Sequence, residues 1–202
     1  MALLDWMATD TTLVLEGDGV RLRPPRMGDF AEWSILRSRS RDFLQPWEPT
    51  WPADDLTRAA FRRRLSVYGR DIETGAGYPF FVFRVEDEAL VGGVTLSNVR
   101  RGVAQAATLG YWVGAPHARM GYTIRAVKAV TDFAFGRLKL HRVEAACLPS
   151  NTPSRDLLLK AGFSLEGKAR AYLKINGAWT DHLLFGLVSD EAGWGEDTTS
   201  GG

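Results

Sequence analysis

The chain has 202 residues, of which 45% are hydrophobic and 24% are charged. This length suits one domain, or two small ones, with a core large enough to fold without a disulfide or a metal. The 25 basic and 24 acidic residues nearly cancel, which excludes a strongly basic nucleic-acid coat protein. With one cysteine, no signal-peptide pattern and no apolar run of about 18 residues, the sequence predicts a cytoplasmic protein that binds neither nucleic acid nor membrane.

The first third of the chain is expected to hold one strand and two helices. An alternating stretch predicts a strand over 19–23, which ends at two prolines. Apolar residues at helical spacing predict a helix over 29–39. Residues 44–52 hold three prolines and two tryptophans and are expected to form a shaped loop. Acidic residues then open an Ala/Arg/Leu-rich helix, predicted over 54–72.

Strands dominate the remainder. Four strand-like runs are predicted, at 80–85, 90–96, 106–113 and 141–148. A predicted helix over 122–137, with Val127, Val130 and Ala134 on one face, separates the last two strands, which are therefore expected to be parallel. A further helix over 151–161 is followed by strands at 165–173 and 178–188, which the dipeptide Asn176-Gly177 joins as a hairpin.

These elements predict one α+β (α/β) domain around a mixed, mostly antiparallel central sheet with flanking helices. We expect the domain to cover residues 17–188, after an N-terminal extension over 1–16. The segment 189–202 is polar, acidic and rich in glycine, so it is expected to be a disordered tail.

Two segments carry the most chemical information. The first runs from a strand through Gly121 into a helix, and unpaired N–H groups at a helix start suit an anion such as phosphate. Arg119, Arg125 and Lys128 add positive charge nearby. The alternative is an ordinary strand-to-helix turn with solvated basic residues, and the residues alone leave both interpretations open.

The second segment is Pro149-Ser150-Asn151-Thr152-Pro153-Ser154. Asn151 suits a helix N-cap, which is its structural interpretation. Its functional interpretation is an amide that pairs with an amide of a ligand lying between the two parallel strands.

Together these segments resemble the GNAT superfamily of acyl-CoA N-acyltransferases, and within it the ribosomal-protein alanine N-terminal acetyltransferases (RimJ/RimL-like). The resemblance covers roughly residues 20–187 and depends on the order and spacing of several short motifs. These motifs are Arg21-Leu22-Arg23, Leu44-Gln45-Pro46-Trp47-Glu48-Pro49, Gly110-Tyr111-Trp112-Val113, Gly121-Tyr122, Asn151-Thr152-Pro153-Ser154, Lys160-Ala161-Gly162-Phe163 and Asp181-His182-Leu183-Leu184.

The resemblance implies a GNAT fold in which two central parallel strands splay apart to admit acetyl-CoA as co-substrate. Its pantetheine arm would pair with the backbone at Trp112 and Val113, with Asn151 facing it. A backbone N–H near Val113 would hold the oxyanion. The pyrophosphate would lie on backbone N–H groups of the loop, namely those of Arg119, Met120, Gly121, Tyr122, Thr123 and Ile124.

The sequence also departs from the family pattern. Ala118 stands where the loop pattern has Gln or Arg, and Thr123 where it has Gly or Ala. Thr108 replaces a glutamate that commonly serves as general base, and Leu158 replaces a tyrosine proposed to protonate the thiolate.

Other residues must then supply these roles if the chain is an enzyme. The candidates for the general base are Glu48 and His182, each of which has a structural alternative. Ser154 is the candidate donor to the thiolate, with a first-turn helix serine as its alternative. Trp47 and Trp51 are expected to line the acceptor cleft, unless they are simply core.

The resemblance implies an acetyl-CoA-dependent N-acetyltransferase in which the amine attacks the thioester directly, so Cys147 is not a nucleophile. We expect the acceptor to be the α-amine of a protein N-terminus, because its pKa of ~7.7–8.0 leaves more of it neutral at pH 7 than a lysine amine. Two alternatives stay open, a small-molecule or antibiotic N-acetyltransferase and an idle acyl-CoA-binding module. We expect no metal, since the three histidines lack ligand spacing, and a monomer or homodimer.

Overall fold

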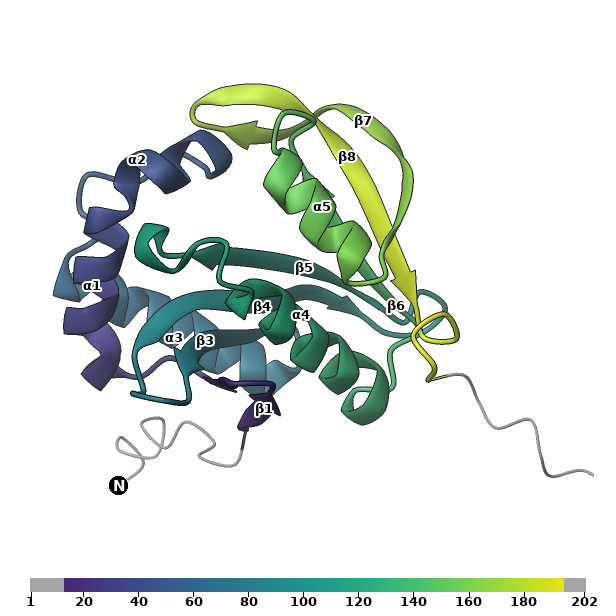
Figure 1. The fold of residues 1–202 in the computed structure, drawn as a ribbon, viewed down its shortest axis with the longest axis horizontal. Helices are drawn as coiled ribbons and strands as arrows, with labels where there is room; N and C mark the ends of the chain where they lie inside the picture. The colour runs from purple at the N-terminus through teal and green to yellow at the C-terminus, as the bar shows by residue number, and fades with distance from the viewer. Residues whose placement is uncertain (1–12, 195–202) are drawn as a thin grey trace, which may run out of the picture.

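One eight-stranded sheet organises the chain in a computed structural model that describes residues 13–194 (Figure 1). Along the sheet the strands follow the order β1-β2-β3-β4-β5-β6-β8-β7. The strands are β1 (Leu15–Gly17), β2 (Val20–Arg23), β3 (Tyr78–Arg84), β4 (Leu90–Arg100), β5 (Ala106–Val113), β6 (Arg142–Cys147), β7 (Ser164–Ile175) and β8 (Ala178–Val188). The α-helices are α1 (Phe30–Arg39), α2 (Arg41–Leu44), α3 (Arg58–Thr74), α4 (Tyr122–Asp132) and α5 (Thr152–Lys160).

The strand pairs are antiparallel except for β5 and β6, which pair in parallel as predicted. A parallel pair needs a crossover, and α4 provides it between these two strands. The predicted hairpin between β7 and β8 is also present. Its turn residues Asn176 and Gly177 both have positive φ, 44° and 84°, which is the geometry that the Asn-Gly dipeptide favours.

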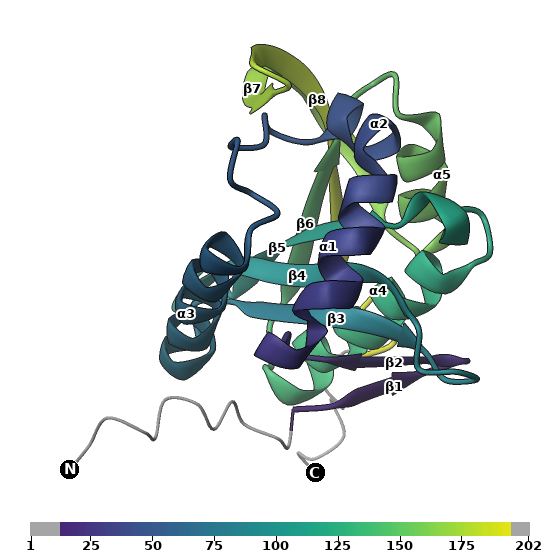
Figure 2. The same ribbon diagram turned by 90° about the vertical axis from the view of Figure 1, so that its left-hand side faces the viewer.

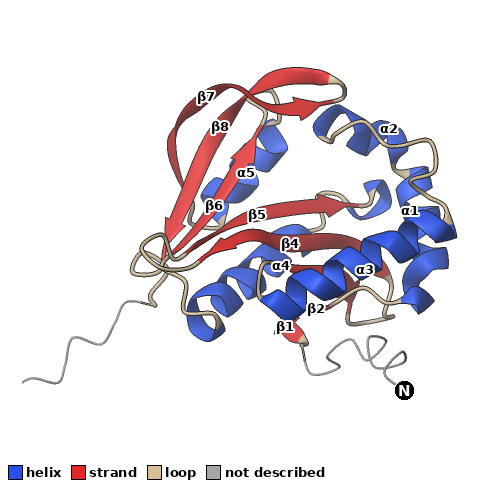
Figure 3. Ribbon diagram, turned by 180° about the vertical axis from the view of Figure 1, so that it is seen from behind, coloured by secondary structure: helices blue, strands red, loops and turns tan. Residues whose placement is uncertain are grey.

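Two apolar cores lie on opposite faces of the sheet (Figures 2 and 3). Helices α4 and α5 cover one face, where Val127, Val130 and Ala134 are fully buried, as their helical spacing predicts. Helices α1 and α3 cover the other face, where Trp33 and Phe61 are buried against β3 and β4. The sheet thus separates two cores, each covered by its own pair of helices.

The structure corrects the predicted start of α3. The helix begins at Arg58 rather than at residue 54, because Thr57 is its N-cap and accepts a hydrogen bond from the Ala60 N–H at 3.2 Å. The two acids that suggested an earlier start precede the helix and pair with its arginines, Asp54 with Arg63 and Asp55 with Arg64. Part of the predicted loop 44–52 is helical as well, with α2 followed by a short 3₁₀ turn over Gln45–Trp47.

Three further differences concern element ends. The helix predicted over 122–137 changes after Asp132 into a π-helical turn over Phe133–Arg137. Strand β1 pairs with β2 and extends the sheet two residues before the expected domain start at residue 17. Residues 189–194, expected in a disordered tail, fold back in turns, and the Trp194 indole donates to Asp132 at 3.3 Å. Residues 1–12 of the expected extension and 195–202 of the expected tail lie outside the described residues.

The aromatic core under α1 and α3 is expected to contribute strongly to stability. Phe61 is fully buried, and its ring centroid lies 4.7 Å from that of Trp33 and 5.6 Å from that of Phe30. Phe61→Ala should lower the free energy of unfolding by about 3–5 kcal/mol through lost burial and an unfilled cavity. Chemical denaturation measures this change. The matched control is Val67→Ala on the exposed side of the same helix, and equal losses in the two variants would contradict the prediction.

Candidate active site

The central feature is a split between β5 and β6. The two strands pair from Ala106–Arg142 to Leu109–Ala145 and then stop. Beyond this point β5 stays paired with β4 as far as Val113, and β6 stays paired with β8 as far as Cys147 (Figure 1). Half of the backbone groups in residues 110–113 therefore face away from β4 toward the split, where an extended ligand can pair with them as an added strand would.

The strand register assigns the side chains around the split to two faces. Leu109, Ala145 and Phe185 form one row across β5, β6 and β8, and all three belong to the core under α4 and α5. Because side chains alternate, Tyr111 and Cys147 follow on that same face. Thr108 and Glu144 belong to the opposite face, and so do Trp112 and His182 farther along. The split thus connects the α4/α5 side of the sheet with the α3 side.

The start of α4, on the α4/α5 side, is the candidate for the anion site expected from the sequence. Its N-cap is Gly121, in the left-handed conformation with φ 81°, and no side chain caps the helix. By contrast, Thr57 caps α3 and Asn151 caps α5. Uncapped N–H groups together with the positive end of the helix dipole favour a phosphate here.

The basic residues of this loop divide into two kinds. The Arg125 guanidinium donates to the carbonyls of Asp18, Met120 and Gly121 at 2.9–3.1 Å, so it holds the loop in shape. Arg119 is exposed and has a positive φ of 62°, which leaves its side chain available to a ligand. The sequence grouped both as ligand charges, and the structure assigns to Arg125 a role in fixing the loop.

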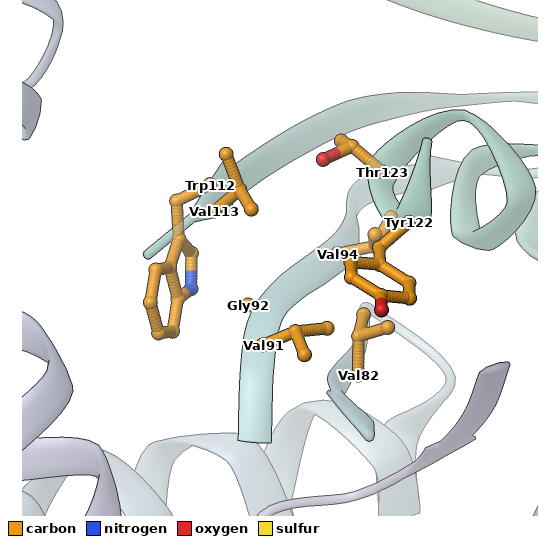
Figure 4. Close-up of a pocket in the computed structure, with 8 residues that line it drawn as sticks. All are labelled: Val82, Val91, Gly92, Val94, Trp112, Val113, Tyr122 and Thr123. Carbon is orange, nitrogen blue, oxygen red and sulfur yellow. The ribbon is translucent and has the colours of Figure 1, made fainter. Parts of the chain in front are cut away.

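A narrow crevice of about 10 Å³ lies between the end of β5 and the first turn of α4 (Figure 4). Thr123 and Tyr122 line it from the helix, and Trp112 and Val113 line it from the strand. The crevice has room for about one water molecule.

Tyr111 and Ser154 meet across the split. The Tyr111 hydroxyl lies 2.7 Å from Ser154 Oγ. It also donates a hydrogen bond to the Ser154 backbone carbonyl at 3.3 Å. Burial raises the pKa of Tyr111, so the phenol stays protonated and can donate. Burial also raises the pKa of Cys147, against a smaller opposite effect of a Ser154 hydrogen bond. A protonated thiol in this place agrees with the expectation that Cys147 is not a nucleophile.

Asn151 has the N-cap role that its sequence position suggested. Its Oδ1 accepts a hydrogen bond from the Ser154 N–H at 3.1 Å, which orients the first turn of α5. The amide nitrogen of Asn151 has no hydrogen-bond partner within residues 13–194, so the capping and ligand-facing roles are compatible.

His182, on β8, has the geometry of an oriented imidazole. Its side chain is 3% exposed, and Nδ1 lies 3.0 Å from the Thr180 carbonyl, which can only accept. The proton is therefore assigned to Nδ1, and Nε2 is left with a free lone pair. Its ring packs edge-on against Tyr172, with the centroids 5.8 Å apart. An imidazole held in this tautomer can accept a proton at Nε2.

Glu48, the other candidate base, is tied into a cluster. Its carboxylate accepts two hydrogen bonds from Arg37, at 2.6 and 2.7 Å, and a third from the Trp51 indole at 2.7 Å. Arg37 is 6% exposed and stacks over Trp51 at 4.2 Å. The Glu48 backbone carbonyl also accepts from Asn176 at the tip of the β7–β8 hairpin. The cluster fixes the wall beside the split, and its carboxylate oxygens are occupied.

A groove on the α3 side begins where the strands part. It has a volume of about 550 Å³, and we call it the α3 groove. Its lining comprises Asp71, Ala76, Ser97, Asn98, Val99, Arg100, Thr108, Glu144 and Tyr172. No local sequence pattern predicts this groove, because its residues come from five separate elements. Sequence reasoning also assigned no role to Tyr111, although that residue stands in the motif Gly110-Tyr111-Trp112-Val113 that marked this strand.

Within residues 13–194, no cluster of His, Cys, Asp and Glu has an arrangement that could hold a metal ion. No helix in the same range is both long and apolar enough to cross a membrane.

Comparisons with known proteins agree with this geometry. Residues 20–164 match the family model described as an acetyltransferase (GNAT) domain. The Bacillus subtilis protein named probable N-acetyltransferase YjcK is 36% identical over 178 residues, 88% of this chain and 98% of the relative. The Escherichia coli ribosomal protein uS5-alanine N-acetyltransferase is 32% identical over 154 residues, 76% of this chain and 79% of the relative.

Solved structures give the same result. Mycobacterium smegmatis RimJ, in complex with CoA-disulfide, superposes with a TM-score of 0.82 at 35% identity, covering 88% of this chain and 87% of that one. The Vibrio fischeri ribosomal-protein-S5-alanine acetyltransferase has the same TM-score at 30% identity and covers 88% and 97%. These matches confirm the resemblance and the fold class predicted from the sequence: the chain belongs to the GNAT family of acetyltransferases.

Proposed function

We propose that this chain uses acetyl-CoA to acetylate a primary amine, and that the amine is the α-amine of a protein or peptide N-terminus. The observation that carries the proposal is the split between β5 and β6, which leads directly to the uncapped start of α4. The split offers free backbone groups of β5 to an amide-containing arm, and the start of α4 offers N–H groups to a pyrophosphate. Relatives support the co-substrate, since Mycobacterium smegmatis RimJ is described in complex with CoA-disulfide.

In this proposal the two faces of the sheet hold different substrates. Acetyl-CoA lies on the α4/α5 side, with its pantetheine arm along Trp112 and Val113 and its pyrophosphate on the N–H groups of residues 119–124. Asn151 faces the arm. The amine approaches from the α3 side and meets the thioester carbon at the split. A backbone N–H near Val113 stabilises the oxyanion as the amine adds.

Proton transfer is assigned to residues on each side. The C–S bond breaks and CoA leaves as a thiolate, which the Ser154 hydroxyl stabilises by donating a hydrogen bond and which takes its proton from water; the Tyr111 phenol, 2.7 Å away, donates a hydrogen bond to Ser154 Oγ. His182 accepts the proton of the amine at Nε2, either directly or through one water, while Thr180 holds Nδ1. Glu48 supports the acceptor wall, because Arg37 and Trp51 occupy its oxygens.

Two observations favour an α-amine as the acceptor. Relatives at 32% identity are named ribosomal protein uS5-alanine N-acetyltransferases. An α-amine also has a pKa of ~7.7–8.0, against ~10.4 for lysine, so it needs less help from a base. This matters because Thr108 stands where many relatives of this fold supply a carboxylate, and a threonine cannot accept the proton.

The first test concerns the anion site. Acetyl-CoA should raise the melting temperature of the wild type, because a ligand at 100 times its dissociation constant stabilises the folded state by about 2.7 kcal/mol. Gly121→Ala should abolish most of this shift. The matched control is Gly102→Ala. Gly102 also has a positive φ, 66° against 81° for Gly121, and a Cβ atom there would meet open space. Equal acetyl-CoA shifts in the two variants would contradict the loop as the binding site.

The second test concerns the acid. Tyr111→Phe should lower kcat about tenfold with little change in the KM for acetyl-CoA, because it removes one hydrogen bond used only in the transition state. Ser154→Ala should lower kcat by about 100-fold. If Tyr111 acts through Ser154, the double variant is no slower than Ser154→Ala alone. Additive losses in steady-state kinetics would show that Tyr111 does not act through Ser154.

The third test concerns the base. His182→Gln should lower kcat/KM by about 100-fold at pH 7. The loss should shrink as pH rises through ~7.7–8.0, because an α-amine that is already neutral needs no base. Glu48→Gln should instead act on stability, costing about 3–5 kcal/mol by leaving the Arg37 charge buried and unpaired. Unfolding curves and pH–rate profiles of both variants distinguish these roles. If the loss of kcat/KM in His182→Gln does not depend on pH, His182 is not the base.

A further inference from the structure

The α3 groove carries an uncompensated negative charge. Four of the charged residues in and beside it neutralise one another: Glu144 pairs with Arg100 and Arg142, and Arg142 pairs with Glu166. Asp71 is different. It lines the groove, its side chain is half-buried, and its carboxylate has no ion-pair or hydrogen-bond partner within residues 13–194.

The position of Asp71 is unfavourable for the helix that carries it. Asp71 lies in the last turn of α3, where the helix dipole is negative and where no basic residue provides compensation. The backbone carbonyl of Asp71 accepts hydrogen bonds from Ala76 and Gly77, but the carboxylate takes no part in this helix end. Helix stability therefore gives no reason for an acid here. The carboxylate and the helix end together form a corner that attracts a cation.

This corner is set apart from the amine that reacts, because Asp71 is displaced sideways from the split. A Cβ atom built at Gly77 would lie 3.7 Å from the Asp71 carboxylate and 3.1 Å from the Leu96 carbonyl of β4, and β5 lies between β4 and the split.

We propose that the acceptor carries a second positive charge, separate from the acetylated amine, which binds in the α3 groove at Asp71. This inference rests on the proposed amine acetylation and specifies its substrate class. Two sources share the chemistry: a basic side chain close to a peptide N-terminus, and the far amine of a small diamine. Tyr172 forms the opposite wall of the groove, and its exposed ring can cover the aliphatic part of either.

The experiment compares acceptors that differ only in the second charge. Thiol release from acetyl-CoA is measured with peptides that begin Ala-Lys, Ala-norleucine or Ala-Glu, and with 1,5-diaminopentane against pentylamine. Wild type should prefer the charged member of each accepted pair by about tenfold in kcat/KM, the size of one charge-assisted hydrogen bond. Asp71→Asn, of equal shape, should reduce this preference to less than about twofold. Preference within the peptide set or within the amine pair identifies the source.

Controls separate this inference from the proposed function. Glu73→Gln, an exposed acid of the same helix turn that does not line the groove, should keep the preference. Asp71→Asn should melt no lower than wild type, since it removes an acid from a helix C-terminus. If no amine is acetylated, the proposed function fails, and calorimetric binding of the same peptides to the CoA-saturated protein still tests the groove. Equal use or binding of the lysine and norleucine peptides, or a preference that survives Asp71→Asn, would overturn the inference.

Discussion

Two parallel strands that stop hydrogen-bonding halfway along their length are the constraint on which the site depends. Beyond Leu109 and Ala145, β5 and β6 are held only from their outer sides, by β4 and by β8. A split sheet is costly in lost hydrogen bonds unless something else pairs with the free backbone. Here the Tyr111–Ser154 side-chain contact joins β5 to α5, and the free backbone beyond Leu109 is available to a ligand.

The packing around the split explains why it keeps its shape. A side chain at Gly114 would collide with the Leu36 side chain, so α1 rests directly on the end of β5. On the far side, the buried ion pair between Arg37 and Glu48 fixes the α1–α3 connection. The backbone N–H of Asn176 donates to the Glu48 carbonyl and so joins this connection to the tip of the β7–β8 hairpin. With separate cores above and below the sheet, the two strands are fixed apart while their faces stay chemically distinct.

How far the sequence predicted this structure depends on whether a feature is local. The parallel orientation of β5 and β6 and the Asn176-Gly177 turn could be predicted, because strand and helix periodicity and turn residues act over a few positions. The start of α3 was misplaced because Asp54 and Asp55 resemble a helix start while Thr57 provides the cap. The Tyr111–Ser154 contact joins residues 43 positions apart, and the α3 groove joins five elements, so no local pattern contains either. His182 could be named as a candidate base, but the orientation of its ring by Thr180 follows only from the structure.

The measurement that tests the central claim most directly is hydrogen–deuterium exchange of the full chain with and without saturating acetyl-CoA. If the co-substrate lies in the split on the α4/α5 side, protection should increase in residues 110–113 and 119–124. The paired half of β5, residues 106–109, and the groove segment 97–100 should be unchanged, because the first is already paired and the second faces the other side. Protection that appears in 97–100 while 110–113 and 119–124 stay unchanged would contradict the account.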